Sequence, residues 1–193
     1  FALRYPGVRL HLRQADPDEI LRLVAAGEAD IGVSTEVGGE RSDLLLLPGR
    51  VVERSLIMPL GHMLTKKQRV TLADIAQYPL VGYHPKQRGG QIIGDTFRAR
   101  GLVPKLVVSA IDSDIIKAYV AEGIGIAVIP TLALDLEADR ALRVVDVTSL
   151  FPRSVMTVSL RRDVYLRRFI PDFIQLVAPK WGYEAIQREM VPG

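Results

Sequence analysis

Two hydroxyl residues follow a short apolar run in the first fifth of the chain. Ser34 and Thr35 come directly after Ile31-Gly32-Val33, which has the composition of a short buried strand. A hydroxyl group can donate a hydrogen bond to the oxygen of an anion, so this pair at a strand end is a candidate small-molecule site. A turn that caps itself with the same hydroxyls is the alternative that the residues leave open.

A second polar segment, from His84 to Gln91, combines basic side chains with glycines. Backbone amides at the start of a helix, together with a guanidinium group, can hold an anion. The alternative is an exposed loop that binds nothing. The segment precedes a predicted helix over Ile92 to Arg100 and contains four candidate ligand residues, Gln87, Arg88, Gly89 and Gly90.

Two serines flank a strand-to-helix turn in the second half of the chain. Ser109 is a further candidate ligand residue, while simple helix capping is the alternative for both Ser109 and Ser113. Asp112 and Asp114 in the same turn are explained by helix capping, and we do not interpret them as a general acid and base.

No arrangement of residues indicates catalysis. The three histidines, His11, His62 and His84, are not paired at the spacing of a metal site. The sequence has no Gly-x-Ser-x-Gly elbow, phosphate-binding loop or dinucleotide fingerprint. Cysteine is absent, which excludes disulfides and thiolate metal ligands. We therefore predict that the chain is not an enzyme and has no cofactor other than a small anionic ligand.

The composition bounds the class of protein. The chain has 193 residues, of which 48% are apolar, which is enough for one large domain or two smaller lobes. Its 25 basic and 22 acidic residues give a net charge of +3, too balanced to indicate a nucleic-acid-binding surface. No apolar run approaches the roughly 18 residues of a membrane-spanning helix, so we predict no membrane partner.

The elements that position these residues begin with a strand, a helix and a second strand. Val8 to Arg13 alternates apolar and polar residues, which is the period of a half-buried strand. Asp16 and Pro17 are typical of a helix start, and Gly27 of a helix end. A helix that connects two strands predicts a parallel sheet, in which ligands bind at the carboxyl ends of the strands.

The same order of signals recurs over Lys105 to Ile129. Asp112 and Gly123 repeat the spacing of Asp16 and Gly27, which favours two similarly built α/β lobes.

A polar turn is predicted over residues 36–43, and the tail after Gly182 is expected to have little to bury. Further strands are predicted over 44–47 (closed by Pro48-Gly49), 51–59, 79–83, 142–147 and 155–160, and helices over 71–77 and 165–181, the latter either kinked or beginning at Pro171.

Several of these segments resemble one protein family. RYPGVRLHLRQADPDEILRLVAAGEADIGVSTE resembles the effector-binding domain of LysR-type transcriptional regulators. AQYPLVGY, IDSDIIKAYVAEGIGIAVIP and FIPDFIQLVAPKW are similar to the CysB-type branch, which regulates sulfur assimilation and sulfonate use. The resemblance implies two Rossmann-like lobes joined by two crossover strands, as in periplasmic binding proteins, with the effector in the inter-lobe cleft. Lobe I is then expected to comprise residues 1–50 and 153–193, and lobe II residues 51–152.

The resemblance also implies roles for single residues. Thr35 matches a threonine that binds sulfate-like anions in the CysB-type cleft, and Gly89 matches a loop glycine. Arg88 stands where those relatives carry a second threonine, and Val52 where they carry a tryptophan that lines the cleft. An added positive charge and a smaller side chain favour an anion that is larger or more highly charged than sulfate. The effectors expected are sulfate, adenylyl sulfate, a sulfonate or an acetylserine-like metabolite.

Regulators of this family carry an amino-terminal winged helix-turn-helix that is absent from this chain, so DNA binding is expected only of the intact protein. A cytoplasmic location, a homodimer or homotetramer formed through the helices near 17–26 and 115–122, and contact with RNA polymerase are further expectations. Two alternatives stay open. One is a periplasmic solute-binding protein for an oxyanion, and the other is an enzyme of the deaminase or transaldolase sort on similar lobes, for which no nucleophile or base is evident.

Overall fold

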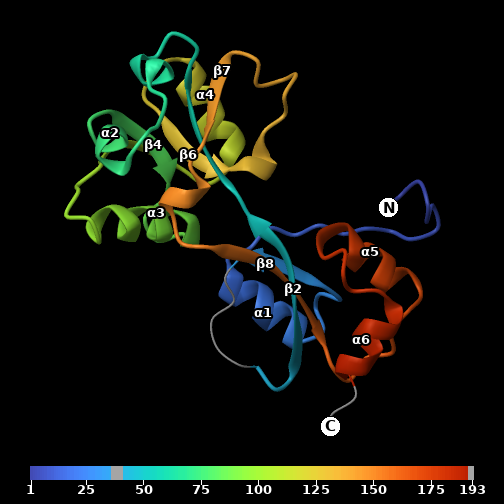
Figure 1. Ribbon diagram of the computed structural model, residues 1–193. Helices are drawn as coiled ribbons and strands as arrows, with labels where there is room; N and C mark the ends of the chain where they lie inside the picture. Colours follow the sequence, from blue (N-terminus) through green and yellow to red (C-terminus); the bar gives the residue numbers. More distant parts are fainter. Residues whose placement is uncertain (36–40, 191–193) are drawn as a thin grey trace. The chain divides into compact units, whose positions relative to one another are not determined.

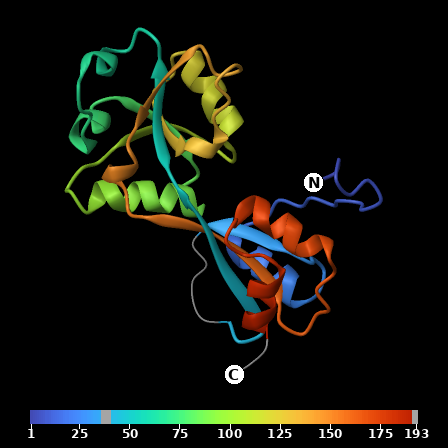
Figure 2. The same cartoon turned by 45° about the vertical axis from the view of Figure 1, so that its right-hand side comes forward.

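The computed structural model describes residues 1–35 and 41–190 and divides into two compact units. Unit 1 comprises Phe1–Val51 and Ser154–Gly193, and unit 2 comprises Val52–Arg153. The chain therefore leaves unit 1 within strand β2 (Leu44–Val52) and returns where strand β8 (Ser154–Arg161) begins, as the cyan and orange ribbons of Figure 2 show. The boundaries expected from the sequence lie one residue before these.

Unit 1 contains a three-stranded sheet in the order β1-β8-β2, in which β1 (Gly32–Thr35) runs antiparallel to β8. Its helices are α1 (Pro17–Ala25), α5 (Phe169–Val177) and α6 (Tyr183–Met190). The main core of the unit is apolar and includes Leu47, Val158, Leu160, Ile174 and Ile186.

Helix α1 begins and ends as its sequence predicts. The carboxylate of Asp16 accepts a hydrogen bond from the amide of Glu19 at 2.9 Å, and Pro17 is the first helical residue. Gly27 has a φ of 72°, the left-handed conformation that glycine adopts without the steric cost of a Cβ atom. These local predictions are confirmed.

The predicted strand over Val8–Arg13 is wrong, because none of these residues is in a strand. Leu10 and Leu12 are exposed. An alternating sequence becomes a strand only when a neighbouring strand completes its backbone hydrogen bonds, and β1 pairs instead with β8. The predicted parallel strand–helix–strand unit is therefore absent from the described part of unit 1. The turn predicted over 36–43 lies mostly outside the described residues.

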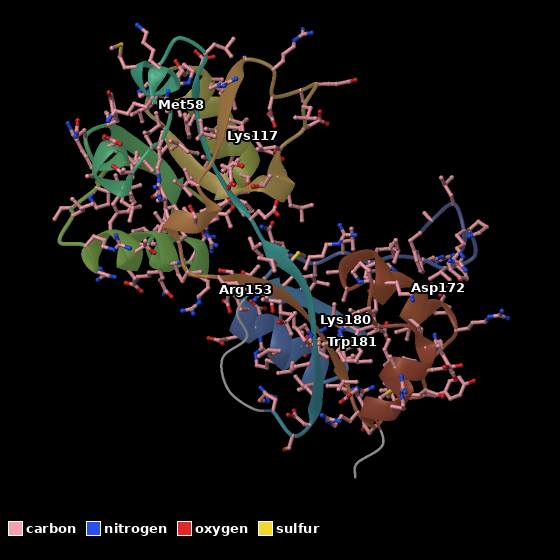
Figure 3. All side chains as sticks on the ribbon, viewed as in Figure 1. Met58, Lys117, Arg153, Asp172, Lys180 and Trp181 are labelled. Carbon is pink, nitrogen blue, oxygen red and sulfur yellow. The ribbon has the colours of Figure 1, made fainter. Side chains whose placement is uncertain are left out.

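Strand β2 continues through Pro48 and Gly49, where the sequence predicted its end. It is an outer strand of its sheet, a position that tolerates the missing N–H of proline. A Cβ atom on Gly49 would lie 3.0 Å from the carbonyl oxygen of Val177, so glycine allows the end of α5 to approach the strand. The indole N–H of Trp181 donates to the carbonyl oxygen of Pro48 at 2.9 Å, which ties the residues after α5 to β2 (Figure 3).

The carboxyl-terminal helices resolve one alternative and correct one expectation. Helix α5 begins at Phe169 and contains Pro171 in its first turn, where the missing N–H leaves no hydrogen bond unmade. The tail was expected to bury little, yet α6 buries Ile186 completely. Ile186 packs against the core of the unit, which holds this short helix in place.

Unit 2 contains the strands β3 (Arg54–Pro59), β4 (Pro79–Tyr83), β5 (Lys105–Ala110), β6 (Ala127–Pro130) and β7 (Leu142–Asp146). Its helices are α2 (Leu72–Ala76), α3 (Arg88–Arg98) and α4 (Ser113–Ala121), with short 3₁₀ turns at Met63–Lys66, Thr131–Ala133 and Thr148–Leu150. Strand β3 lies between β6 and β7 and runs antiparallel to both.

Helices α3 and α4, which begin within or directly after the predicted ligand segments, each follow a parallel strand. Strands β4 and β5 pair in parallel, and a bridge between Leu80 and Ile126 joins β4 in parallel to the segment before β6. Helix α3 follows the carboxyl end of β4, and α4 follows that of β5, so both helices begin at the same edge of the sheet (Figure 1). This is the edge at which α/β sheets bind ligands.

Candidate functional site

The start of helix α3 is the centre of the candidate site in unit 2. The helix begins at Arg88, four residues before its predicted start at Ile92. Its N-cap is Gln87, whose side chain makes no capping hydrogen bond. The amides in the first turn of a helix have no intrahelical acceptor, and their partial positive charge favours an anion.

The two glycines of this turn let the helix start against the end of β4. A Cβ atom on Gly90 would lie 2.4 Å from the carbonyl oxygen of His84, a distance that no side chain can adopt without moving the backbone. A Cβ atom on Gly89 would lie 3.1 Å from the ring of Tyr83. The sequence marked both glycines as candidate ligands; the structure adds a packing requirement, which is strict at Gly90.

Gln87 connects this helix start to the turn before α4. Its side-chain amide donates to the carbonyl oxygen of Ile111 at 3.4 Å, while its side-chain oxygen is buried and accepts no hydrogen bond from the described residues. Arg88 is exposed at the first position of α3, and Ser109 is exposed on β5 opposite Gly82. Val52 is buried at the end of β2.

The hydroxyl residues of unit 1 end strand β1. Ser34 is 8% exposed, and its hydroxyl has no hydrogen-bond partner among the residues that the structure describes. It lies opposite Thr157 on β8, and the half-buried Thr35 lies opposite Met156. Within the described residues the hydroxyl of Ser34 does not cap its own turn. That Ser34 and Thr35 share a ligand with Arg88 stays a prediction.

A pair of hydroxyl groups whose contact the sequence did not predict lies beside the start of α3. The hydroxyls of Tyr83, at the end of β4, and Ser113, at the start of α4, are 2.5 Å apart. Burial raises the pKa of Tyr83, so the phenol keeps its proton at neutral pH. The sequence predicted the strand that ends at Tyr83. A hydroxyl group at the carboxyl end of a predicted strand was the signal that could have identified Tyr83 as a site residue.

The aspartate before Ser113 supplies the cap of α4. The carboxylate of Asp112 accepts a hydrogen bond from the amide of Ile115 at 2.9 Å. Capping is therefore confirmed as the role of Asp112, but it does not account for the hydroxyl of Ser113.

A second hydroxyl pair and a buried arginine lie in the same unit. The hydroxyls of Ser55 and Thr131 are 2.8 Å apart, and Ser55 is 2% exposed. Arg54 is 7% exposed, and its guanidinium carbon lies 5.9 Å from the centre of the Phe151 ring. The positive charge of Arg54 opposes the rise in the pKa of Tyr83, so the two side chains lie within electrostatic range.

The histidines of unit 2 have local structural contacts. The Nδ1 atom of His62 accepts a hydrogen bond from the amide of Leu64 at 3.2 Å, and burial lowers the pKa of this imidazole. The Nδ1 atom of His84 accepts from the amide of Lys86 at 3.2 Å. Across residues 1–35 and 41–190, no three His, Cys, Asp or Glu side chains are grouped so that they could hold a metal ion. Within the same ranges, no helix has both the length and the apolar character needed to cross a bilayer.

Comparison with known proteins places this geometry in a family. The family model for the LysR substrate binding domain matches residues 1–182. The HTH-type transcriptional regulator CysB of Burkholderia cenocepacia is 34% identical over 190 residues, which cover 98% of this chain and 61% of that protein. The regulator SsuR of the same species is 37% identical over 175 residues, covering 91% of this chain and 57% of that protein. The chain thus spans about three fifths of the length of these curated relatives.

A solved structure agrees with these matches. The crystal structure of the cofactor-binding domain of the Cbl transcriptional regulator superposes with a TM-score of 0.86 at 33% identity, covering 100% of this chain and 84% of that one. The fold and these relatives define a ligand-binding domain of the LysR type, and the chain belongs to the LysR substrate-binding domain family.

Within that family it is an effector-binding domain of the branch that includes CysB, Cbl and SsuR, so the predicted resemblance and the α/β fold class are confirmed. The relatives are transcriptional regulators, and the family is not enzymatic, which confirms the prediction that the chain is not an enzyme. These relatives do not favour the alternative of a periplasmic solute-binding protein.

Proposed function

We propose that the chain senses a small anionic sulfur metabolite for a cytoplasmic transcriptional regulator of sulfur metabolism. The observation that carries this proposal is the match to CysB and SsuR over more than nine tenths of the chain. The effector classes proposed are sulfate, adenylyl sulfate, sulfonates and acetylserine-like compounds. Binding then alters the affinity of the intact regulator for DNA, because a ligand shifts an equilibrium by its differential affinity for two states.

Donor groups in each unit support an anionic effector. In unit 2 these are the guanidinium of Arg88 and the first-turn amides of α3 near Gly89, which the side chain of Gln87 does not cap. In unit 1 the donor groups are the hydroxyls of Ser34 and Thr35. The hydroxyl of Ser34 has no hydrogen-bond partner among the described residues. Hydrogen bonds from such donors to a charged oxyanion are stronger than bonds between neutral groups.

The partner proposals follow from the family. Homodimers or homotetramers are proposed to form through the exposed faces of α1 and α4; Ile115 and Tyr119 on α4 are 40% and 38% exposed. DNA contact is proposed for the intact regulator only, and RNA polymerase is proposed as its further partner. Sedimentation of the chain at increasing concentration tests self-association, and a strict monomer at high concentration would contradict it.

The anion proposal is tested by a thermal-shift screen at constant ionic strength. The compounds are sulfate, thiosulfate, O-acetylserine, adenylyl sulfate and short alkanesulfonates, with chloride as the ionic control. We expect at least one compound to raise the unfolding temperature, since a ligand that binds only the folded state stabilises it. Calorimetry with the best compound should then show about tenfold weaker binding for Arg88→Ala, because one charge-assisted hydrogen bond is lost. Unchanged affinity would remove Arg88 from the site, and no stabilisation by any compound would contradict the proposed function.

A further inference from the structure

The hydroxyl of Ser113 does not provide the cap of α4. Ser113 is the first residue of the helix, and the preceding Asp112 provides the capping hydrogen bond to Ile115. Ser113 is half-buried, and its hydroxyl oxygen lies 2.5 Å from that of Tyr83. This contact is therefore what holds the side chain of Ser113 in place.

Two paired hydroxyl groups retain one hydrogen for an outside acceptor. Each group carries one O–H, and their mutual hydrogen bond uses only one of the two. A phenol is more acidic than an aliphatic alcohol, so Tyr83 is the better donor and Ser113 the better acceptor. With Tyr83 donating, the hydrogen of Ser113 stays available at the carboxyl-terminal edge of the sheet.

Tyr83 also contacts the start of α3. Its ring is the surface that a Cβ atom on Gly89 would meet at 3.1 Å. Tyr83 lies opposite Ala110 across the parallel pair β4 and β5, so it stands between the first turns of α3 and α4. One rigid side chain thus sets the position of both Gly89 and the hydroxyl of Ser113.

We propose that Ser113 donates a hydrogen bond to an oxygen of the anionic effector and that Tyr83 is the positioning residue that orients it. The inference rests on the proposed function, which it extends by naming a ligand hydroxyl and its support. The donor is neutral, and it suits a ligand oxygen that carries no hydrogen, such as those of sulfate or a sulfonate.

The test compares three variants by calorimetry with sodium sulfate and a short alkanesulfonate as the probes. Ser113→Ala should weaken binding by about tenfold, the effect of losing one hydrogen bond to a charged group. Tyr83→Phe keeps the ring against Gly89 and should weaken binding by a smaller factor. In the double variant, Tyr83→Phe should add nothing to Ser113→Ala, because Tyr83 acts only through Ser113.

The control is Tyr78→Phe, which removes another tyrosine hydroxyl, one residue before β4 begins at Pro79, and should leave the affinity unchanged. Unfolding temperatures of all variants separate loss of binding from loss of fold. Unchanged affinity in Ser113→Ala, with the original chain binding normally, overturns the role of Ser113 and leaves the proposed function standing. Additive losses in the double variant overturn the positioning role of Tyr83. Failure of the original chain to bind either probe overturns both assignments.

Discussion

Helices α1 and α4 share a sequence pattern but occupy different surroundings. Each is capped by an aspartate, Asp16 or Asp112, and each ends before a glycine with positive φ, Gly27 or Gly123. Helix α4 follows a parallel strand and packs into a core with residues of β3, β4 and β6. Helix α1 follows a segment that forms no strand, and its buried Leu21 and Val24 form a small apolar cluster with Leu44, against which Leu46 of β2 also packs. The same capping and helix-ending residues therefore produce helices with the same start and end. The neighbouring strands decide which side chains each helix buries.

The difference is sharpest at one equivalent position, five residues after each cap. In α1 this position is Leu21, which is 4% exposed and packs with Val24 and Leu44. In α4 it is Lys117, whose ammonium group contacts the carbonyl oxygen of Ala133 at 2.8 Å and carboxylates of Asp114 and Asp139 at 3.0 Å each (Figure 3). Burial works to lower the pKa of Lys117, but the hydrogen bonds to Asp114 and Asp139 outweigh it and raise the pKa. The same helix position therefore faces apolar side chains in α1 and carboxylate and carbonyl groups in α4.

Exchanging these two side chains should produce the largest effects. Leu21→Lys removes apolar burial and places a charge where apolar residues surround it, and we expect a loss of roughly 4 kcal/mol in the free energy of unfolding. Lys117→Leu leaves the carboxylate of Asp139 without its ammonium partner, and we expect a loss of about 2 to 3 kcal/mol. Denaturant titration followed by Trp181 fluorescence and by circular dichroism measures both.

Arg22→Leu is the matched control for the exchange. Arg22 is on α1 beside Leu21, its side chain is 64% exposed, and it reaches Glu19 at 3.5 Å. A surface pair of this kind contributes little, so the change should stay within about 0.5 kcal/mol. If Leu21→Lys were equally harmless, the claim that α1 and α4 face chemically different surroundings would be wrong.

Removing the capping aspartate should destabilise the protein by the same amount in α1 and in α4, whereas exchanging Leu21 and Lys117 should not. Asp16→Ala and Asp112→Ala each remove one hydrogen bond of 2.9 Å to a first-turn amide. Each should cost about 1 kcal/mol, the usual value for a lost N-cap. Asparagine at either position keeps an acceptor oxygen and should recover most of the loss. A difference of several-fold between the two alanine variants in denaturant titrations would show that the caps depend on their tertiary surroundings.

The smallest expected difference is in acid sensitivity: lowering the pH should destabilise unit 2 slightly more than unit 1. In unit 2, the hydrogen bond from Lys67 and those from Thr71 lower the pKa of Asp74, and the amide of Thr148 lowers that of Asp146. A carboxylate with a lowered folded-state pKa stabilises the fold above its unfolded value of about 3.9, and this stabilisation is lost as the pH falls through the folded pKa. In the described part of unit 1, Asp43 shows such a lowering through Arg41, at the surface.

Hydrogen exchange followed by mass spectrometry between pH 5 and pH 3, corrected for intrinsic exchange rates, measures this difference. Protection in α2 and β7 of unit 2 should fall before protection in α1 and β8 of unit 1. Asp74→Asn should make unit 2 less sensitive to this acidification. The reverse order of loss would contradict the assignment of acid sensitivity to unit 2.

The candidate site was predictable in part. Gln87, Arg88, Gly89 and Gly90 were identified because glycines and a guanidinium before a helix form a pattern that extends over a few residues only. The pairing of Tyr83 with Ser113 was not predicted, since it joins the end of β4 to the start of α4, 30 positions apart in the sequence. The packing requirement at Gly90 was likewise not predicted, because it depends on how closely α3 approaches the carbonyl group of His84.

The sequence by itself determined where α1, α2 and α4 begin, because a capping side chain acts on amides within its own first turn. It also determined the positive-φ helix ends at Gly27 and Gly123, since that conformation depends on the residue's own lack of a Cβ atom. Only the tertiary structure decided that Val8–Arg13 forms no strand, that β2 continues through Pro48 and that α6 buries Ile186. Strand pairing and burial depend on residues that are distant in the chain. A local sequence pattern does not specify which distant residues will pack or pair with it.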